Sequence, residues 1–401
     1  MSGTITRFCA WLIAAIWFAV PAAAAPSDAA LRAVLQRNLS QYLSARSKIE
    51  HISAISLSIS LHGQSENINV TAGRTQYGGA TPVTPQTLWQ TGSQTKAFTA
   101  STILQLEAER KLTIDQTVGR WLPQYPAWKD LTIRRLLNMT SGIPDYAVAP
   151  AMLADYAKNR KRNFTVAELI AYVYPGNPHA PPPTTGWDYS NTNYLLAELI
   201  VERATGQSYA SEIERRFLRS KVGLNDTYYA ATQYPRDVIN RMVSGYFVSH
   251  DAEAAALAPL LGSDTRDDSV SWLRASGGIV STPEDVTRWV RALYTGWILA
   301  PTQRAELLSL VSQKTGKPIA KTSPSDAHGF GLGVAQVTLP ATGTIWFYEG
   351  ETLGYRMVYV YFSQQDAVLA FGLNSLPDSK DDQSGKLIDT IYKTLRGAGR
   401  L

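Results

Sequence analysis

The clearest hydrophobic pattern in the chain lies just after residue 50. Apolar residues at positions 55, 57, 59 and 61 alternate with serines at 56, 58 and 60, and this period of two predicts a half-buried β-strand. The segment NINVTAG (67–73) is predicted to be the hairpin partner of that strand. Residues 27–48, which come before it, are predicted to form a helix. This part of the chain therefore predicts two antiparallel strands next to one helix.

A second group of predicted strands lies near the end of the sequence. After His328 the chain contains four apolar segments, GFGLGVAQV, TIWFYEG, YRMVYVYF and AVLAFGL, whose β-branched and aromatic residues favour strands. A last helix is predicted from about residue 382 to residue 396. Strand-forming segments are thus expected at both ends of the chain.

The middle of the chain, from about residue 99 to residue 273, is predicted to be mainly helical. Thr132, Thr165 and Thr282 are expected to be N-caps, because each stands just before an apolar-periodic segment. Glu168 completes a capping box with Thr165. These signals divide the middle of the chain into several separate helices.

Together these segments predict an α+β fold. Strands from the two ends would build one antiparallel sheet, flanked by the N- and C-terminal helices, and the middle would form a large helical insertion. We therefore expect residues 26–400 to form one unit, with a sheet region at about 26–97 and 275–400 and a helical region at about 98–274. The proline-rich segment PGNPHAPPPTTG (175–186) is expected to be an ordered but irregular loop.

Composition changes this picture mainly at the N-terminus. The chain has 401 residues and is 45% hydrophobic, which is enough for a large buried core. Residues 1–25, however, combine Arg7, an uncharged apolar run at 8–20 and small residues at 22–25, which is typical of a secretory signal peptide. The apolar run is shorter than the roughly 20 residues that span a bilayer, so a retained membrane anchor is the weaker alternative. We expect cleavage after Ala24, a secreted or periplasmic protein and no stable membrane span after cleavage.

The remaining composition limits the classes of function. The formal net charge is +5, and the one dense basic run, KNRKR (158–162), is better explained as a solvated loop than as a nucleic-acid contact. The one cysteine, Cys9, lies in the predicted signal peptide, so neither a disulfide nor thiol chemistry is expected in the mature protein. The sequence has no H-E-x-x-H motif, no Cys/His metal spacing and no glycine-rich phosphate loop. No metal and no organic cofactor are expected.

The segment TGSQTKAFT (91–99) contains the most informative polar pair, Ser93 and Lys96. Three residues along a helix is just under one turn, so the two side chains share a face, and Ser93 stands at or near a helix start, where the dipole favours a developing negative charge. A serine hydroxyl becomes a nucleophile when a base removes its proton, and a buried lysine can be neutral and act as that base. The alternative is a capping serine with a solvated lysine, but no other lysine in the chain has a serine three residues before it.

The segment GWDYSNTNYLLAEL (186–199) supplies a second pair, Tyr189 and Asn191, in the only Y-x-N of the chain. Tyr189 is expected in a loop or at a helix start, beside Lys96 if the fold brings the two together. A phenolate next to a lysine can act as a general base, and a phenol can protonate a leaving group. Asn191 offers an amide that can orient a substrate. The alternative is a packing tyrosine and a turn asparagine.

At this point the sequence resembles a known family. Four separated segments, TGSQTKAFT, LTIRRLLNMTSGIPDY, WDYSNTNYLLAELI and ASGGIVSTPEDVTRW, are similar to the serine β-lactamase and D-alanyl-D-alanine carboxypeptidase (penicillin-recognising) family, on its class C side, which includes related esterases and D-aminopeptidases. The resemblance runs from about residue 50 to residue 375. It implies Ser93 as the acylated nucleophile, Lys96 and Tyr189 as the proton-transfer pair, Asn191 as a substrate contact, and a site between the sheet and the helical region.

The third motif of that family, K-T-G or H-x-G on a strand beside the site, differs in this sequence. A literal KTG occurs at 314–316, but it ends a predicted helical segment and runs into Pro318, so it is expected to be a loop. The better match is IWFYEGETLGY (345–355), which places Tyr348 where the family has lysine or histidine. Gly350 would let the backbone approach a substrate closely.

The same segment is expected to supply the oxyanion hole and the rim of the site. The N–H groups of Ser93 and Glu351 would form the oxyanion hole. With Tyr348 in the motif, the cation that attracts a substrate carboxylate is missing, and Glu349 and Glu351 make the rim more negative unless Arg356 reaches inward. β-Lactams and D-Ala-D-Ala peptides both carry such a carboxylate. The change therefore weakens the expectation of β-lactam turnover but leaves acyl-enzyme chemistry intact.

Three functional hypotheses follow from these residues. The leading one is a secreted serine hydrolase of β-lactamase or D-Ala-D-Ala carboxypeptidase type, acting through a covalent acyl-enzyme. The second is an esterase or D-amino-acid peptidase on the same scaffold with little β-lactam turnover. The third is a non-catalytic binding protein, against which the presence of Ser93, Lys96 and Tyr189 argues. The expected partner is a small-molecule or peptide substrate (a β-lactam, a D-amino-acid peptide or an ester), and no nucleic acid.

Overall fold

The structure, a computed structural model, describes residues 27–177 and 186–401. The predicted signal peptide and most of the proline-rich segment 175–186 lie outside the described residues. Secretion therefore stays a prediction, which the N-terminal sequence of the purified protein can check. Within the described part of the chain, no helix combines the length and the apolar character needed to cross a membrane.

A nine-stranded sheet forms the centre of the fold, and every neighbouring pair of its strands is antiparallel. The segments from the two ends of the chain pair as the sequence predicts, because β1 lies between β2 and β13. Together with the segregated helices, this sheet confirms the α+β class. In spatial order the strands are β2 (Ile68–Gly73), β1 (Ala54–Ser60), β13 (Ala367–Leu373), β12 (Tyr355–Phe362), β11 (Gly343–Thr352), β10 (Ala335–Leu339), β9 (His328–Phe330), β7 (Leu310–Ser312) and β8 (Pro318–Ile319).

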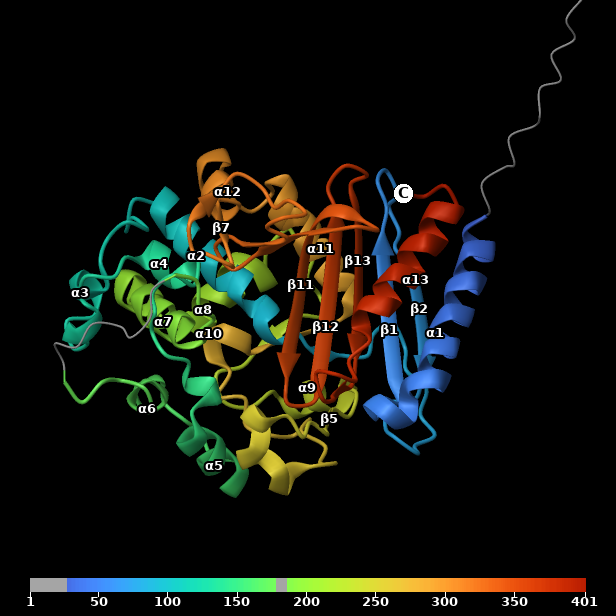
Figure 1. Ribbon diagram of the computed structural model, residues 1–401, viewed down its shortest axis with the longest axis horizontal. Coiled ribbons are helices and arrows are strands. Elements are labelled where there is room, and N and C mark those ends of the chain that lie inside the picture. Colours follow the sequence, from blue (N-terminus) through green and yellow to red (C-terminus); the bar gives the residue numbers. More distant parts are fainter. Residues whose placement is uncertain (1–26, 178–185) are drawn as a thin grey trace, which may run out of the picture.

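Helices cover both faces of the sheet. Helices α1 (Asp28–Glu50) and α13 (Ser384–Gly397) lie side by side over one face (Figure 1). Helix α1 begins at Ser27, whose hydroxyl caps the helix by accepting from the N–H of Ala30. Helix α11 (Pro283–Thr295) packs on the opposite face, against β1, β12 and β13. The sheet is thus the middle layer of three.

The packing of α11 on this face corrects the burial predicted for β1. The strand was expected to be half-buried, but all seven of its residues are buried. The serine face is covered because small side chains let α11 pack closely, and Arg291 of α11 donates to Ser60 Oγ over 3.1 Å. Alternating serines therefore mark a polar contact with a helix in this strand, and not a solvated face.

The middle of the chain folds into short helices joined by turns, as predicted. Thr132, Thr165 and Thr282 each accept a backbone N–H as N-caps, and Glu168 closes the predicted capping box. The α-helices of this region are α2 (Thr95–Ala108), α3 (Val118–Trp121), α4 (Ile133–Leu137), α5 (Pro150–Lys158), α6 (Val166–Ala171), α7 (Thr192–Thr205), α8 (Tyr209–Ile213), α9 (Arg236–Arg241) and α10 (Arg274–Gly277), followed in the sequence by α11 and α12 (Pro301–Leu307). Short 3₁₀ and π turns, η1 (Gly92–Gln94), η2 (Pro126–Trp128), η3 (Tyr146–Val148), η4 (Glu214–Leu218) and η5 (Ala252–Leu260), complete it.

Short strands also occur beside these helices. The pairs are β3 (Trp89–Gln90) and β4 (Tyr228–Tyr229) with β6 (Ile279–Ser281), and β5 (Tyr246–Phe247) with β14 (Ser375–Leu376). They connect the helical region to both ends of the sheet region, so the two parts share one continuous fold.

Two predictions of secondary structure after residue 310 need correction. The segment 329–337 was predicted as a single strand, but it forms β9 and β10 with a turn between them, where Gly333 has φ +74°. The KTG at 314–316 lies in the turn of the β7–β8 hairpin, so it is a loop as predicted, but it follows a strand and not a helix. Hairpins in both places extend the sheet beyond β11.

The basic run at 158–162 is held by ion pairs. Arg160 pairs with Asp268 at 2.8 Å, and Lys161 pairs with Asp267 at 2.9 Å. Arg162 pairs with Asp155, also at 2.8 Å. Because acidic neighbours balance its charge, the run serves the local structure of the helical region.

Candidate active site

The site forms where β11 separates from β10. The two strands pair only from Gly343 to Trp346 on β11. Beyond Trp346, β11 runs beside the turn η1, which carries Ser93. The second half of β11 is therefore free on one side to face the nucleophile candidate.

Two glycines allow this close approach. A Cβ atom on Gly350 would lie 2.0 Å from the carbonyl oxygen of Thr91 and 3.1 Å from the backbone nitrogen of Ser93. A Cβ atom on Gly92, which has φ +50°, would lie 2.4 Å from the carbonyl oxygen of Glu351. Glycine is required at both positions because the two backbone segments touch each other. The backbone groups of Ser93 and Glu351, the predicted oxyanion-hole pair, thus lie on facing segments.

Ser93 stands at the start of a helix, as the sequence predicts. The turn η1 runs directly into α2, so Ser93 is placed before the first α-helical residue and Lys96 lies within the first turn. Gln94 fixes this start to the sheet, because its Nε2 donates to the carbonyl oxygen of Met357 over 2.6 Å. The serine hydroxyl is thereby held beside β11 by a packed element and not by a loop.

The Lys96 amine is fully buried and has three oxygen partners. Its Nζ lies 3.0 Å from Ser93 Oγ, 2.7 Å from Asn191 Oδ1 and 2.9 Å from the carbonyl oxygen of Ser276, and the exposed fraction of the residue is 0%. The turn between β9 and β10 closes the site from behind, because a Cβ atom on Gly333 would lie 2.7 Å from the carbonyl oxygen of Lys96.

Asp145 determines which atom of Asn191 faces Lys96. The carboxylate of Asp145 accepts hydrogen bonds from the backbone N–H and from Nδ2 of Asn191, over 3.1 and 2.8 Å. A carboxylate is an acceptor only, so the NH₂ end of the amide must point to Asp145 and the oxygen end to Lys96. Although Asn191 stands at the N-cap position of α7, its side chain does not cap the helix. It bridges an acid and a lysine.

These partners fit a neutral lysine. Burial lowers the pKa of Lys96 to about 7, against the opposing effect of the Asp145 charge. A neutral amine has two N–H donors and one lone pair. The two donors match the acceptor oxygens of Asn191 and Ser276, and the lone pair is then directed to the hydroxyl of Ser93. The arrangement holds the serine proton beside a base near neutral pH.

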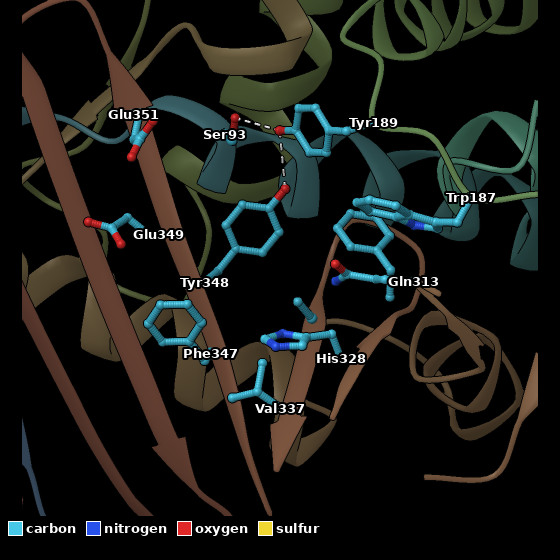
Figure 2. A pocket seen from close by; sticks show the side chains of 12 residues that line it. Ser93, Trp187, Tyr189, Gln313, His328, Val337, Phe347, Tyr348, Glu349 and Glu351 are labelled. Carbon is cyan, nitrogen blue, oxygen red and sulfur yellow. Dashed lines mark hydrogen bonds between the residues drawn. The ribbon is translucent and has the colours of Figure 1, made fainter. Parts of the chain in front are cut away.

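Tyr189 approaches the same serine from the other side. Its hydroxyl donates to Ser93 Oγ over 2.7 Å and lies 3.3 Å from the hydroxyl of Tyr348 (Figure 2). Burial raises the pKa of Tyr189, so at neutral pH the side chain is a phenol. The phenolate base considered from the sequence is therefore disfavoured in the resting site, and the proton-donor role is favoured.

Lys96 and Tyr189 meet through Ser93 and not directly. The sequence predicts Tyr189 beside Lys96, and the Lys96 amine lies over the tyrosine ring, 4.9 Å from its centroid. The shared partner of both side chains is Ser93 Oγ. The two groups are thus placed to exchange protons through the nucleophile.

The structure places Tyr348 on the site and Arg356 away from it. Tyr348 is 6% exposed and its hydroxyl reaches Tyr189, as noted above. Arg356 is fully buried, with Nη2 2.7 Å from Glu50 Oε2 and Nη1 2.8 Å from Asp382 Oδ1. Because both ends of its guanidinium are held by acids, Arg356 does not supply the cation that Tyr348 lacks.

Arg356 also accounts for the acidic cluster beside the site. Carboxylate oxygens of Glu349, Glu351 and Asp382 all lie within 4.8 Å of one another. Burial and the neighbouring carboxylates raise the pKa of Glu349 to about 8, and burial also raises the pKa of Glu351. Since Arg356 already acts as the internal cation of this group, the cluster provides no independent reason to assign a metal.

Three cavities surround Ser93. The largest has a volume of about 380 Å³, lies on the Tyr189 side and has aromatic walls (Figure 2). A small one of about 60 Å³ lies on the Asn191 side, and a third of about 280 Å³ adjoins it. Glu351 lines all three, and Ser93 lines the first two. The nucleophile candidate therefore lines both the aromatic cavity and the smaller cavity on the Asn191 side.

The sequence reasoning missed part of this site. Asp145 and Ser276 belong to two of the segments that resemble the family, but neither received a role. For Asp145 the usable signal was an acid directly after the turn GIP. Ser276 contacts Lys96 through a backbone carbonyl, which any residue type could supply. Trp187 and Phe330 line the aromatic cavity and carry no motif of their own.

The chain resembles known proteins along most of its length. A family model described as Beta-lactamase matches residues 39–390. Penicillin-binding protein 4* of Bacillus subtilis (strain 168) is 27% identical over 304 residues, which cover 76% of this chain and 64% of that protein, so the chain spans less than two thirds of this relative. A solved D-stereospecific amidohydrolase from Streptomyces sp. is 25% identical, with a TM-score of 0.73 and coverage of 90% of this chain and 98% of that one. A D-amino acid amidase from Ochrobactrum anthropi SV3 is 22% identical, with a TM-score of 0.75 and coverage of 92% and 99%.

Proposed function

This chain belongs to the β-lactamase family, and we propose that it is a serine hydrolase acting through a covalent acyl-enzyme on amides or esters that carry no carboxylate beside the scissile bond. The observation that carries the proposal is the hydrogen-bonded set at Ser93, with a buried lysine on one side and a phenol on the other. This set supplies a base for the nucleophile and an acid for the leaving group.

In the proposed acylation step, Lys96 takes the hydroxyl proton of Ser93 while Oγ forms a bond to the substrate carbonyl carbon. The carbonyl oxygen becomes an oxyanion, which the N–H groups of Ser93 and Glu351 stabilise. The bond to the leaving nitrogen or oxygen then breaks as Tyr189 gives its phenol proton to that atom. The proton held by Lys96 restores the phenol.

Deacylation reverses these roles with water as the nucleophile. The water oxygen bonds to the acyl carbon, its proton passes through the same pair of side chains to Ser93 Oγ, and the bond from Oγ to carbon breaks. The products are an acid and the free serine, so no other reactant is needed. The helix start at Ser93 favours the negative charge that develops in both steps.

The charges around the cleft support a substrate without a carboxylate. Among the described residues, no Lys or Arg lines the cavity of about 380 Å³, whereas the acidic residues Glu349 and Glu351 both line it. An anionic group bound there would lose its hydration without gaining an ion pair. The similarity to a D-stereospecific amidohydrolase supports D-amino-acid amides or peptides as the first class to test. Carboxypeptidase and β-lactamase activity, the leading hypothesis from the sequence, is thereby ranked below hydrolysis of uncharged amides and esters.

Ester hydrolysis is the second candidate function. An ester needs less help from the leaving-group acid than an amide does, so the same residues serve it. A non-catalytic binding role is disfavoured because burial of an otherwise unused lysine beside a serine would cost stability.

Replacing Tyr348 with lysine should shift substrate choice towards carboxylates. Wild-type protein is expected to hydrolyse a short-chain nitrophenyl ester better than nitrocefin. A lysine amine at this position can bind the nitrocefin carboxylate, and a charge-assisted hydrogen bond contributes about 1.5–3 kcal/mol, so the nitrocefin-to-ester ratio of kcat/KM should rise about tenfold to hundredfold. The measurement is kcat/KM for both substrates in each variant.

Tyr348→Phe is the matched control for that experiment. It removes the hydroxyl contact with Tyr189 without adding a charge, so it should leave the nitrocefin-to-ester ratio near the wild-type value. A wild-type preference for nitrocefin, with no change in the lysine variant, would mean that the carboxylate is held elsewhere and would contradict the proposed substrate class.

A further inference from the structure

The cavity of about 380 Å³ next to Tyr189 has a distinct chemical character. Aromatic rings form its walls, with ring centroids 5.8 Å apart for Trp187 and Phe330 and 6.0 Å apart for Phe330 and Tyr348. Phe347 of β11 and Val337 of β10 also line it (Figure 2). Cavities of 300–1,000 Å³ with mainly apolar walls are typical of small-molecule sites.

The position of the phenol indicates which half of a substrate enters this cavity. The leaving atom must lie within hydrogen-bond reach of the group that protonates it. Tyr189 is that group in the proposed reaction, and it lines the aromatic cavity with its hydroxyl between Ser93 and Tyr348. The leaving group therefore extends into this cavity. The acyl half must then lie on the opposite side of Ser93, where Asn191 lines the smaller cavity.

The lining also limits the charge of the leaving group. Among the described residues, the polar groups at this cavity are the hydroxyl of Ser93, the carboxyl groups of Glu349 and Glu351, two phenols, the amide of Gln313, the imidazole of His328 and the indole N–H of Trp187. A terminal carboxylate would face the two acidic residues without a lysine or arginine partner. An uncharged aromatic group can instead pack on ring faces and edges at little desolvation cost.

We propose that the cavity lined by Trp187, Phe330 and Val337 is a leaving-group subsite that selects an uncharged aromatic amine or alcohol. This inference rests on the proposed acyl-enzyme function and adds the class of the departing group. Acylation forms the bond from Ser93 Oγ to the acyl carbon, breaks the bond from that carbon to nitrogen or oxygen, and transfers the Tyr189 proton to the departing atom. Water later releases the acyl group as an acid.

The experiment keeps the acyl half constant and changes only the leaving group. The substrates are D-alanine amide, D-alanine benzylamide and D-alanyl-D-phenylalanine, and kcat/KM is measured from the release of D-alanine. The kcat/KM of wild type should be about tenfold to hundredfold higher for the benzylamide than for the amide. This factor corresponds to the binding free energy gained when one aromatic ring is buried. The dipeptide, which carries a carboxylate, should fall well below the benzylamide.

Two variants, one that enlarges the cavity and one that fills it, test whether the leaving group binds there. Trp187→Ala removes an aromatic wall and Val337→Phe fills the space, and both should bring the benzylamide-to-amide ratio close to one. Leu339→Phe is the matched control, because Leu339 lies on the same strand but is 39% exposed and outside the cavity lining. The control should keep the wild-type ratio.

Labelling of Ser93 by a fluorophosphonate separates the two levels of the proposal. Equal rates with the amide and the benzylamide, in a protein whose Ser93 is labelled, would overturn the subsite and leave the hydrolase proposal standing. The same holds if the two cavity variants keep the wild-type ratio. Absence of both labelling and hydrolysis would overturn the proposed function and the subsite with it.

A second inference concerns Asp145, which touches neither Ser93 nor the cavities. Its Oδ1 accepts from the N–H groups of Ala147 and Asn191, over 3.0 and 3.1 Å, and its Oδ2 accepts from Asn191 Nδ2 over 2.8 Å. Burial raises the pKa of Asp145, while these three donors and the nearby Lys96 amine oppose that shift and favour the ionised form. The carboxylate thereby fixes the amide orientation that directs Asn191 Oδ1 to the Lys96 amine.

The geometry points to Asp145 as the positioning residue for Lys96, acting through the amide of Asn191. Its negative charge also opposes the loss of the lysine proton. The rings of Tyr189 and Tyr194 lie 4.9 and 5.5 Å from Lys96 Nζ. The other titratable groups around the amine are Asp145 and Tyr146 at the start of η3, and Tyr348 of β11, which contacts Tyr189. Burial raises the pKa of each of the four tyrosines. Of these five groups, Asp145 is the one whose charge acts on the pKa of Lys96, which it raises.

Asp145→Asn should therefore change the pH profile as well as the rate. The base form of Lys96 is the neutral amine, so kcat/KM rises with pH through the lysine pKa. Removing the nearby negative charge lowers that pKa, and the acidic limb of the profile should move to lower pH. The plateau should fall about tenfold to hundredfold, because one charged hydrogen-bond acceptor is lost. Asp130→Asn, an exposed acid in the same region, is the matched control.

The pH of the acidic limb shows whether Asp145 positions Lys96 or only stabilises the fold. A lower plateau and a lower melting temperature, with the limb unchanged, would overturn the assignment of Asp145 to the lysine. A shift of the limb to higher pH would overturn it as well, because it has the wrong sign.

Discussion

Replacing Ser93 with alanine should lower kcat/KM for any amide or ester substrate by about 10³-fold or more. The hydroxyl is the atom that Lys96 and Tyr189 both contact, so its removal leaves no nucleophile in their hydrogen-bonded set. The residual rate is the part that substrate binding and the oxyanion hole provide. The measurement is steady-state hydrolysis of a nitrophenyl ester and of a D-amino-acid amide by the purified variant.

Ser101→Ala is the matched control for this experiment. Ser101 lies on the same helix, is buried, and its hydroxyl has no hydrogen-bond partner among the described residues. The control should keep wild-type activity. Mass spectrometry of the wild type after exposure to a fluorophosphonate should locate the label on Ser93. A label on another residue, or full activity of Ser93→Ala, would refute the nucleophile assignment.

Lys96→Met and Tyr189→Phe should each lower the acylation rate by about 10²–10⁴-fold, the range of general acid–base catalysis. Both side chains act on one proton path through Ser93, so the double variant should be only slightly slower than the worse single variant. The acylation rate is measured by rapid mixing with a covalent probe. Lys111→Met, in the solvent-exposed turn that follows α2, should change nothing.

The wild-type pH profile adds an independent check on Lys96. Since burial lowers the pKa of Lys96 to about 7, the neutral fraction falls as the pH drops below that value, and acylation should fall with it. The limb should be absent from the small residual rate of Lys96→Met. If the two single losses instead multiply in the double variant, one of the two residues has only a structural role.

The candidate residues Ser93, Lys96 and Tyr189 could be singled out because their signals are local, and the roles proposed for them came from the resemblance of four segments to a known family. Ser93 and Lys96 share a helix face through their spacing alone, and Tyr189 and Asn191 stand two residues apart at the start of a helix. The alternating strand pattern and the threonine N-caps likewise depend on neighbours in sequence. These features follow from the geometry of single elements, so the α+β class and the main catalytic candidates were accessible without coordinates.

The remaining features depend on which distant segments meet. The burial of β1 results from α11 packing on its serine face, which no pattern inside β1 records. The role of Asp145 requires the loop before η3 to reach the start of α7. The direction of Arg356 was left open by the sequence, and it is decided by acids at residues 50 and 382. Only the folded chain brings these groups together.

The buried arginine of β12 connects the ends of the two outer helices to the strands beside the cleft. Glu50 is the last residue of α1, and Asp382 lies just before α13, so each helix contributes one acid to Arg356. Arg356 pairs across the sheet with Glu351, which lines the cleft. Because Glu50, Asp382 and the carbonyl oxygen of Ser375 all hold the buried guanidinium, its charge is balanced inside the fold. Contacts at the ends of the two outer helices thus keep this cation away from the cleft that Ser93 faces.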